Sequence, residues 1–382
     1  MASFAMTKHP AMVLAAGAAG AVGQHVTDTV GNQARVLLVC DPMMVELGHA
    51  ERVSEAVEAA GHRVHLFHDL KSDPLESSVD AATTLAHDND VNCVVGLGGG
   101  SAMDTAKVVA ALAHLGTGCA PYRLATTQLP FRQTALIAMP TTAGTGSETT
   151  GTSIISQADG TKNWFWGPPL KPDLALMDPE LTRGLPPFWT FFTGMDAIVH
   201  CIESRTNRYR YAENDTLAER GIFEGMAHLE RAVKDGNDLE ARAGMMRAAA
   251  HGGLAIANTG CAVGHNIGHA LGTLAGVPHG RAVSIALVQT LDWAWGGNEI
   301  AFERVAEVCG VKGPEGLASR LHDLAHACGQ SLMLQSQEKE KLSSQALAQD
   351  MVSDANIAML ESSARDAAKG DVERLAQAVL AA

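Results

Sequence analysis

The residues best suited to chemistry are an aspartate and four histidines in the C-terminal half of the chain. The segment TGMDAIVHCIES places Asp196 and His200 four positions apart, so both side chains leave the same face of a helix. GHNIGHALGTLAGVPHG places His265 and His269 four apart, and His279 follows ten positions later between a proline and a glycine. One carboxylate with several neutral imidazoles suits a divalent iron or zinc ion and leaves a coordination position open for a substrate.

An ordinary core or surface residue is the alternative for any single histidine. His322 and His326 in HDLAH also lie four positions apart, and we interpret that pair as surface or packing residues. The histidines of the first group each lie in apolar, glycine-rich surroundings, which favours a metal site for that group.

A glycine-rich turn in the N-terminal half is the second candidate site. GLGGGSAMDTAK (residues 96–107) follows an apolar run and leads into an alanine-rich stretch. Such a turn places backbone N–H groups at a helix N-terminus, where they can face a diphosphate, and glycine allows close approach because it has no Cβ. Ser101 can cap that helix or donate to a phosphate, whereas a plain strand-to-helix turn is the alternative. A second cluster, GAAGAVG (residues 17–23), has the wrong spacing for G-x-G-x-x-G, and we interpret it as a turn facing the same cleft.

Two further segments end predicted strands with polar residues. PTTAGTGSE (residues 140–148) offers the hydroxyls of Thr141, Thr142, Thr145 and Ser147, which can complete a nucleotide site at the carboxyl end of a parallel sheet. Asp41 in LLVCDP can accept a hydrogen bond from a ribose 2′-hydroxyl and repel a 2′-phosphate, which favours NAD(H) over NADP(H). A solvated loop and a simple strand-end turn are the respective alternatives.

A parallel sheet would position these segments. Short apolar runs alternate with helical stretches such as HAERVSEAVEAAG up to about residue 185, which predicts βαβ units. The predicted strands are ARVLLVCD, HRVHLFHD, VNCVVGLGGG, TALIAMPTT and PDLALMDP. Beyond GLPP (residues 184–187) almost only helical spacing remains. We therefore predict an α/β nucleotide-binding domain over residues 1–185 and an all-helical metal-binding catalytic domain over residues 186–382.

Composition limits the possible partners and the compartment. A chain of 382 residues exceeds what one core usually supports, and its net charge of −14 argues against nucleic acid. No apolar run reaches the length of about 18 residues needed to span a membrane, and the N-terminus lacks a signal-peptide pattern. Seven cysteines with no C-x-x-C indicate reduced thiols in a cytoplasmic protein.

Four motifs in order, GGGSAMDTAK, PTTAGTGSE, TGMDAIVHCIES and GHNIGHALGTLAGVPHG, resemble those of the iron-containing (group III) alcohol dehydrogenases. The resemblance runs to about residue 290 and weakens over the last ~70 residues. It implies a Rossmann-like domain, a helical metal domain and a cleft between them. The family's metal ligands fall on Asp196, His200, His265 and His279, whereas His269 falls on a position near the nicotinamide and the substrate.

The resemblance also implies the nucleotide contacts and the reaction. The matching nucleotide positions are Asp41, Gly98, Gly99, Gly100, Ser101, Asp104, Thr141, Thr142, Thr145, Ser147 and, as a weaker match, Lys162. The implied reaction is hydride transfer between a primary alcohol, or a hydroxy acid, and NAD, with the alcohol oxygen on Fe²⁺ or Zn²⁺ and with His269 or a nearby water moving the proton. A homodimer or larger homo-oligomer is also implied.

Two segments depart from the family pattern. Arg205, Arg208 and Arg210 in SRTNRYRYAEN are interpreted as solvated surface charge, with an anion-binding role in the cleft as the alternative. The aromatic cluster NWFWGPP (residues 163–169) is interpreted as packing against the hinge between the domains.

Other functions remain open at this point. Related enzymes include glycerol or diol dehydrogenases with a changed ligand set, metal-free maleylacetate reductases, hydroxyacid-oxoacid transhydrogenases and dehydroquinate synthases. The full set of one aspartate and three histidines argues against the metal-free branch. A non-enzymatic nucleotide-binding or metal-storage protein is the alternative from another class, and hydride transfer from NADH to an aldehyde would exclude it.

Overall fold

A computed structural model describes residues 6–381, so the first five residues and Ala382 of the predicted domains lie outside the described residues. The chain forms two compact units. The α/β unit comprises residues 8–142 and 146–184, and the helical unit comprises residues 6–7, 143–145 and 185–381. The loop 143–145 therefore packs with the helices, although it follows a strand of the sheet.

The predicted parallel sheet is present in the α/β unit. Its strands are β1 (Ala11–Leu14), β2 (Arg35–Cys40), β3 (Arg63–Phe67), β4 (Cys93–Gly98), β5 (Ala135–Pro140) and β8 (Leu174–Met177). They lie in the order β1-β8-β5-β4-β2-β3, and every neighbouring pair is parallel. All six residues of β4 are buried, as expected for a strand covered on both faces.

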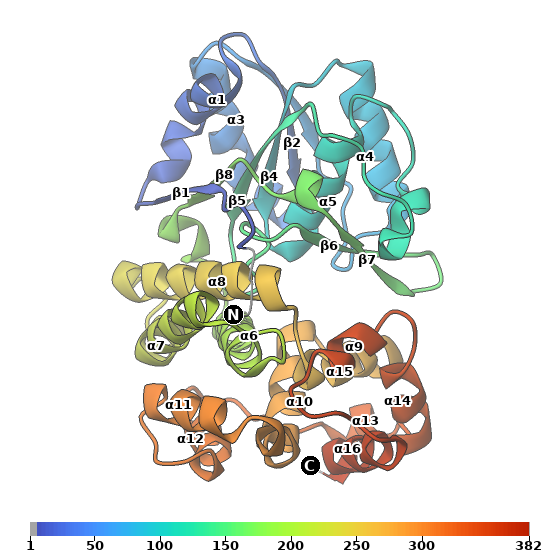
Figure 1. Cartoon of the computed structure of the whole chain (residues 1–382). Coiled ribbons are helices and arrows are strands. Elements are labelled where there is room, and N and C mark those ends of the chain that lie inside the picture. Colours follow the sequence, from blue (N-terminus) through green and yellow to red (C-terminus); the bar gives the residue numbers. More distant parts are fainter. Residues whose placement is uncertain (1–5, 382) are drawn as a thin grey trace. The chain divides into compact units, whose positions relative to one another are not determined.

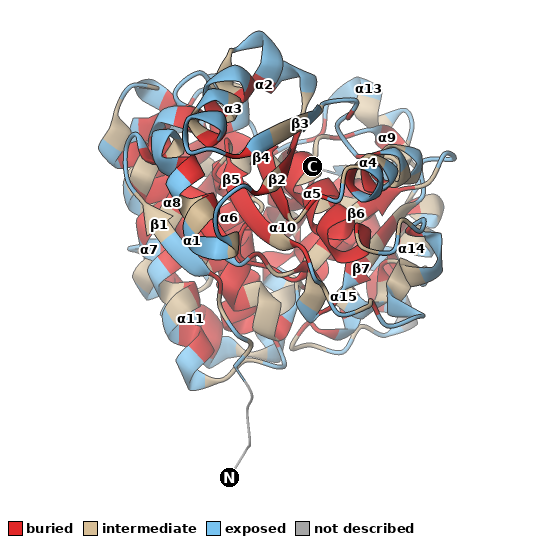
Figure 2. Ribbon diagram, turned by 90° about the horizontal axis from the view of Figure 1, so that it is seen from above, coloured by how far each residue is buried: buried red, intermediate tan, exposed pale blue. Residues whose placement is uncertain are grey.

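Helices cover both faces of this sheet (Figure 1). They are α1 (Val22–Val30), α2 (Pro42–Glu46), α3 (His49–Ala59), α4 (Glu76–Asp88) and α5 (Gly100–Leu112), with short 3₁₀ turns at Ala18–Ala21, Ala120–Ala125, Pro168–Leu170 and Pro179–Thr182. Because side chains alternate along a strand, Leu37 joins the apolar core shared with α4 and α5, whereas Val36 joins the core shared with α1 and α3. Figure 2 shows the sheet strands β4 and β5 as buried.

An antiparallel hairpin was not predicted. It consists of β6 (Thr152–Ser156) and β7 (Lys162–Trp166). The aromatic segment interpreted above as packing against the hinge forms β7, and Phe165 is fully buried in the core of the α/β unit itself together with Leu170. Trp166 on the same strand is 56% exposed. Successive side chains of a strand point to opposite faces, so Phe165 points into the core and its neighbour Trp166 points outward.

The sheet has a topological switch point between β2 and β4. The chain leaves β2 toward the edge strand β3, crosses back to β4 and continues outward in the opposite direction to β5. Cys40 pairs with Leu97, and Gly98 pairs with Pro140, so these three strands end at the same edge. Open parallel sheets bind their ligands at the carboxyl ends of strands beside such a switch point.

The helical unit contains helices and no strand within residues 185–381. These helices are α6 (Pro187–Thr206), α7 (Ala212–Lys234), α8 (Leu239–Thr259), α9 (Val263–Ala275), α10 (His279–Ala294), α11 (Glu299–Val308), α12 (Glu315–Ala327), α13 (Ser336–Lys339), α14 (Ser344–Met351), α15 (Ile357–Glu361) and α16 (Lys369–Ala381), with a 3₁₀ turn at Trp295–Gly297. Helix α6 packs against α7, α8 and α10. Among the described residues, none of the helices is long and apolar enough to cross a lipid bilayer.

Glycines allow the first turn of α10 to approach α6. A Cβ added to Gly280 would lie 2.2 Å from the carbonyl oxygen of Phe192, a separation that no side chain could adopt. His279 directly precedes this contact, so Gly280 lets the start of α10 bring that histidine to α6.

Candidate metal centre and nucleotide-binding edge

Three helices supply the predicted metal-binding residues. Asp196 and His200 lie one turn apart on α6, His265 lies in the first turn of α9, and His279 is the first residue of α10. Asp196, His200 and His265 are buried, whereas the side chain of His279 is 37% exposed. The four residues thus form a buried cage with one side toward solvent.

The donor atoms of these residues converge on one oxygen. Asp196 Oδ1 lies 3.8 Å from His200 Nε2, 3.4 Å from His265 Nε2 and 3.5 Å from His279 Nε2. Ligand atoms that each lie about 2.1 Å from one ion are separated from one another by roughly 3.4 Å in a tetrahedral site. The three separations from Asp196 Oδ1 therefore fit a single first-row divalent ion, and the donor atoms of Asp196, His265 and His279 also lie within 4.8 Å of one another.

The polar atoms of the cage lack other partners. Asp196 Oδ1 and His265 Nε2 are buried and accept or donate no hydrogen bond among the described residues. Burial would raise the pKa of Asp196, but His200 and His279 outweigh it and hold the pKa well below its ordinary value. Burial lowers the pKa of His200 to about 4, although Asp196 opposes this shift. An ionised carboxylate and a neutral imidazole are the forms that bind a metal.

Glu203 lies beside the candidate metal ligands, and the sequence analysis assigned it no role. It lies on α6, one turn beyond His200, and its Oε2 is 2.7 Å from Nδ1 of His265. The same carboxylate accepts hydrogen bonds from backbone amides at the start of α9. Burial opposes ionisation of Glu203, but His265 and these amides outweigh it and lower its pKa. Its position in HCIES, three residues after a proposed ligand, was the available signal.

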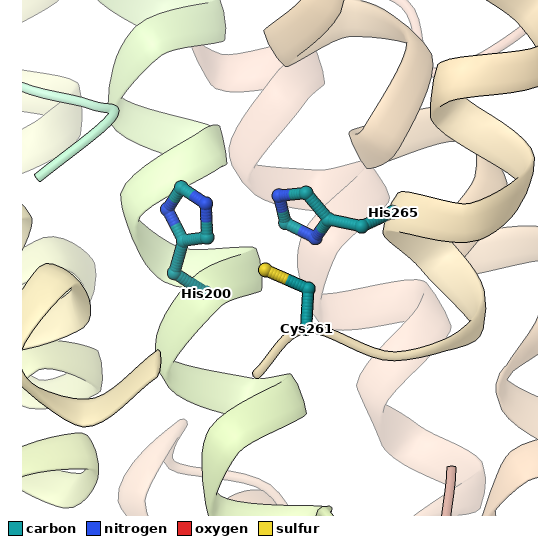
Figure 3. Close-up of side chains that lie close together, drawn as sticks. All are labelled: His200, Cys261 and His265. Carbon is teal, nitrogen blue, oxygen red and sulfur yellow. The ribbon is translucent and has the colours of Figure 1, made fainter. Parts of the chain in front are cut away.

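A thiol also lies beside the cage. Figure 3 shows the Cys261 side chain directed toward the imidazole rings of His200 and His265, and one donor atom from each of the three residues lies within 4.8 Å of the others. Cys261 is partly exposed, whereas the other six cysteines are buried. The same two histidines also face Asp196, at 3.8 Å for His200 and 3.4 Å for His265. The spacing of Cys261 four residues before His265 was the signal for this neighbour.

His269 lies on α9 one turn after His265 and is half-buried. Its ring centroid is 5.3 Å from that of His279 and 6.4 Å from that of His265. It is therefore a neighbour of the cage at its more open side.

The predicted nucleotide residues gather at the switch point of the sheet. Asp41 follows β2, and the turn Gly98–Gly100 joins β4 to α5. Gly98 has φ +152°, and a Cβ added there would lie 2.8 Å from Asp41 Oδ2 and 2.7 Å from Cβ of Ala102. Burial raises the pKa of Asp41, although backbone amides including that of Gly99 oppose this shift. The absence of a side chain at Gly98 thus lets the acid and the glycine turn lie against each other.

The loop after β5 adjoins the same turn. The amide of Thr141 donates to the carbonyl of Gly98 over 2.9 Å, and a Cβ on Gly99 would make ordinary contact with Thr142. Helix α5 begins at Gly100 with Gly99 as its N-cap, so Ser101 is inside the first turn and does not cap the helix. The amides of this 13-residue helix start at the carboxyl edge of the sheet. This is the arrangement that binds phosphate groups in other nucleotide sites.

Two predicted nucleotide contacts bond to the protein itself. Asp104 accepts from the hydroxyl of Ser147 at 2.6 Å and from the amide of Ile154 at 2.8 Å. Lys107, which is fully buried, donates to Thr150 and lies 3.5 Å from Asp104. This network ties α5 to the loop and the hairpin that follow β5.

The remaining predicted positions are Thr145, Lys162 and the second glycine cluster. Thr145 belongs to the helical unit, and Lys162 at the start of β7 forms an ion pair with Asp73 at 2.7 Å. The cluster GAAGAVG forms a 3₁₀ turn and the start of α1, where the amides of Gly17 and Ala19 donate to the carboxylate of Asp178. These amides are therefore satisfied by a carboxylate of the protein itself.

Family models match both halves of the chain. The iron-containing alcohol dehydrogenase model matches residues 10–179, and the C-terminal model of the same family matches residues 190–380. The chain belongs to the iron-containing alcohol dehydrogenase family. The resemblance expected from four motifs is confirmed, and it does not end near residue 290, because the second match continues to residue 380.

Curated relatives support the same assignment. A choline dehydrogenase from Bacillus subtilis is 34% identical over 280 residues, which cover 72% of this chain and 70% of that protein. A 4-hydroxybutyrate dehydrogenase from Cupriavidus necator is 38% identical over 266 residues, which cover 67% of this chain and 69% of that protein. The predicted enzyme class, oxidoreductases that act on CH–OH groups, is thereby confirmed.

Solved structures share the fold. A sulfoacetaldehyde reductase from Bifidobacterium kashiwanohense, in complex with NAD⁺, has a TM-score of 0.89 and 24% identity, covering 100% of this chain and 99% of that one. A 1,3-propanediol oxidoreductase has a TM-score of 0.88 and 24% identity, covering 99% of this chain and 100% of that one. The predicted fold class is confirmed.

The interpretation of the three arginines as solvated charge is wrong for Arg205. That side chain is buried and pairs with Glu219 Oε1 at 2.9 Å and with Asp215 Oδ2 at 3.6 Å. Two acidic partners on α7 make burial of the guanidinium possible. Arg208 and Arg210 are more exposed, and both also pair with carboxylates.

Proposed function

We propose that this protein is a metal-dependent, NAD-linked dehydrogenase that interconverts a primary alcohol and its aldehyde. The observation that carries the proposal is the convergence of three imidazole nitrogens on Asp196 Oδ1. Two of these buried atoms, Asp196 Oδ1 and His265 Nε2, have no hydrogen-bond partner among the described residues. A structural role alone gives no reason to bury such atoms without partners.

The proposed ligands are Asp196, His200, His265 and His279. When bound, a divalent ion polarises an alcohol or carbonyl oxygen, and NAD accepts or returns the hydride. In the oxidation, the C–H electron pair leaves as hydride to NAD⁺, and the hydroxyl proton goes to a base. We assign that base to His269, or to water beside it, because His269 is half-buried and adjoins His279 at the open side of the cage.

The proposed dinucleotide site is the carboxyl edge of the sheet. Backbone amides at the start of α5 bind the diphosphate, and Asp41 accepts from the ribose hydroxyls. Asp41 is the reason to propose a preference for NAD(H) over NADP(H), because a carboxylate beside the glycine turn repels a 2′-phosphate. Gly98, Gly99 and Thr142 support this site by their close approach.

A primary alcohol is the substrate class we propose. Choline and 4-hydroxybutyrate, which appear in the relatives' names, each carry a primary alcohol but differ in charge. Arg205, Arg208 and Arg210 are all engaged by carboxylates, so they provide no support for an anionic substrate. A diol or glycerol dehydrogenase stays the second candidate, supported by the similarity of the fold to a 1,3-propanediol oxidoreductase.

Three further properties belong to this proposal. The metal is Fe²⁺, with Zn²⁺ as a possible replacement, because oxygen and nitrogen donors accommodate both ions. The cysteines are all free, which supports a reducing, cytoplasmic compartment. A homodimer or larger homo-oligomer is proposed from family membership, and sedimentation analysis of the purified protein tests it.

Metal analysis combined with an NADH assay tests the proposed function. The protein is purified without chelators, its iron and zinc are quantified, and NADH oxidation is followed with short aldehydes and semialdehydes. The reverse reaction is measured with alcohols, diols and hydroxy acids. We expect about one divalent ion per chain and aldehyde-dependent NADH oxidation that a chelator abolishes. Full activity in a metal-free preparation would contradict the proposal.

A further inference from the structure

The buried carboxylate of Glu203 contacts both the backbone amides at the start of α9 and the imidazole of His265. The residue is 2% exposed and lies on the same helix as Asp196 and His200. Its Oε2 accepts from the amide of Ala262 at 2.7 Å and lies 2.7 Å from Nδ1 of His265. Its Oε1 accepts from the amide of Gly264 at 2.6 Å and from that of His265 at 3.1 Å.

These contacts satisfy the backbone amides at the N-terminus of α9. The helix has Ala262 at its N-cap position, and alanine has no side chain that can accept from the first amides. Glu203 provides the missing acceptor from another helix, and a negative charge at a helix N-terminus is also favourable. A Cβ added to Gly264 would lie 2.8 Å from Oε1 of Glu203, so glycine is needed at that position for the contact.

The same carboxylate fixes the orientation of His265. A carboxylate accepts and does not donate, so Nδ1 of the imidazole carries the hydrogen of this contact. In the neutral ring Nε2 then has the free lone pair, and it is Nε2 that lies 3.4 Å from Asp196 Oδ1. A carboxylate behind a metal-bound histidine commonly fixes the tautomer and raises the basicity of the ligand.

We propose that Glu203 is a positioning residue of the metal centre, which holds His265 in the metal-binding tautomer and anchors the start of α9 to α6. This inference rests on the proposed metal site. It assigns Glu203 no contact with substrate or ion. Its effect reaches the reaction through His265 and the start of α9.

The test compares Glu203→Gln with Glu224→Gln as a matched control. Glu224 is a carboxylate on α7 that is 1% exposed, and its ion-pair partners, Arg220, Arg247 and His228, are not among the proposed ligands. Zn²⁺ and Co²⁺ affinities are measured by competition with a chelator, and NADH affinity by fluorescence titration. We expect Glu203→Gln to weaken metal binding by about 10- to 100-fold. NADH affinity and the control variant should stay within about twofold of the wild type.

A spectroscopic measurement separates positioning from folding. The visible spectrum of the Co²⁺-loaded protein reports the ligand geometry, and it should change in Glu203→Gln but not in Glu224→Gln. If Glu203→Gln does not fold, ¹H–¹⁵N spectra of the zinc-loaded wild type decide the matter, because the proposal requires the hydrogen on Nδ1 of His265. Metal affinity and Co²⁺ spectrum equal to the wild type, or a hydrogen-free Nδ1, would overturn the proposal. Absence of metal binding by the wild type would instead refute the proposed function.

Discussion

At the scale of single residues, the candidate metal centre depends on the atoms that face Asp196 Oδ1. Three imidazole nitrogens from three helices lie within 3.8 Å of this oxygen. Aspartate and histidine are common residues, but burial and the neighbouring charges change the pKa values of Asp196 and His200. Asp196 has a pKa well below its ordinary value, burial lowers the pKa of His200 to about 4, and Asp196 Oδ1 has no hydrogen-bond partner among the described residues.

Removal of one imidazole should abolish the metal centre. In His265→Ala we expect metal content to fall to near zero and alcohol oxidation to fall by about 10³-fold or more, because polarisation of the substrate oxygen supplies several kcal/mol. NADH affinity should stay within about twofold of the wild type, since the α/β unit is unchanged. His322→Ala, a half-buried histidine on α12, is the control. A metal-loaded, active His265→Ala protein would show that the ligand assignment is wrong.

The cofactor preference is also a residue-scale property. In Asp41→Gly the repulsion of a 2′-phosphate is removed, so the ratio of kcat/KM for NADPH to that for NADH should rise by at least about tenfold, the equivalent of ~1.4 kcal/mol. Asp159→Gly changes an exposed acid in the turn between β6 and β7 and should leave the ratio unchanged. Equal ratios in the two variants would remove the assigned role from Asp41.

At the scale of elements, the glycine turn after β4 depends on close approach between segments. Strand β4 lies between β2 and β5, so its turn meets Asp41 on one side and the loop of Thr141 and Thr142 on the other. The positive φ of Gly98 and the short distances to its neighbours leave no room for a side chain. The order of the strands therefore explains why a glycine is needed at the end of β4.

Gly98→Ala tests this element. We expect NADH binding to weaken by about tenfold or more, because the strained backbone and the clash with Asp41 and Ala102 each require the turn to shift. Gly31→Ala is the control, since Gly31 also has a positive φ, +87°, but a Cβ there meets no atom within 4 Å. The two Kd values for NADH are compared by fluorescence titration, and a similar loss in both variants would argue against a specific role of the turn.

At the scale of the whole molecule, the two candidate sites belong to different compact units. The metal cage lies in the helical unit, and the glycine turn and Asp41 lie in the α/β unit. Each unit has apolar clusters made from its own residues. A ligand that binds one site should therefore stabilise the helices or the sheet that hold it.

Metal removal tests this division. Binding of an ion to the folded state alone stabilises it by about 2.7 kcal/mol at a concentration of a hundred times its Kd. Treatment with a chelator should therefore lower the hydrogen-exchange protection of α6, α9 and α10, while β2, β4 and β5 keep theirs. Re-addition of Zn²⁺ should restore the protection. A loss spread evenly over both units, or no loss in the three helices, would contradict the assignment of the ion to this cage.

Local patterns in the sequence were sufficient for the fold class and for the candidate residues. The periodicity of apolar side chains and the glycine turns are visible in short segments of sequence. They were enough to predict alternating strands and helices, and hence the parallel sheet. The spacing of four between Asp196 and His200 placed both on one helix face for the same reason. Family motifs then indicated the proposed ligands, and these motifs are also local.

Only the tertiary structure decided which atoms meet across long separations. Glu203 and His265 are 62 positions apart, and no local pattern links their hydrogen bond to the metal cage. Burial of Arg205 depends on acids of α7, and the hairpin β6–β7 depends on pairing that the aromatic residues did not reveal. Contacts of this kind form only when helices and strands pack together. The spacing of residues on a helix can therefore indicate His265 as a ligand. The residue that orients it, Glu203, is brought to it by the contact between α6 and the start of α9.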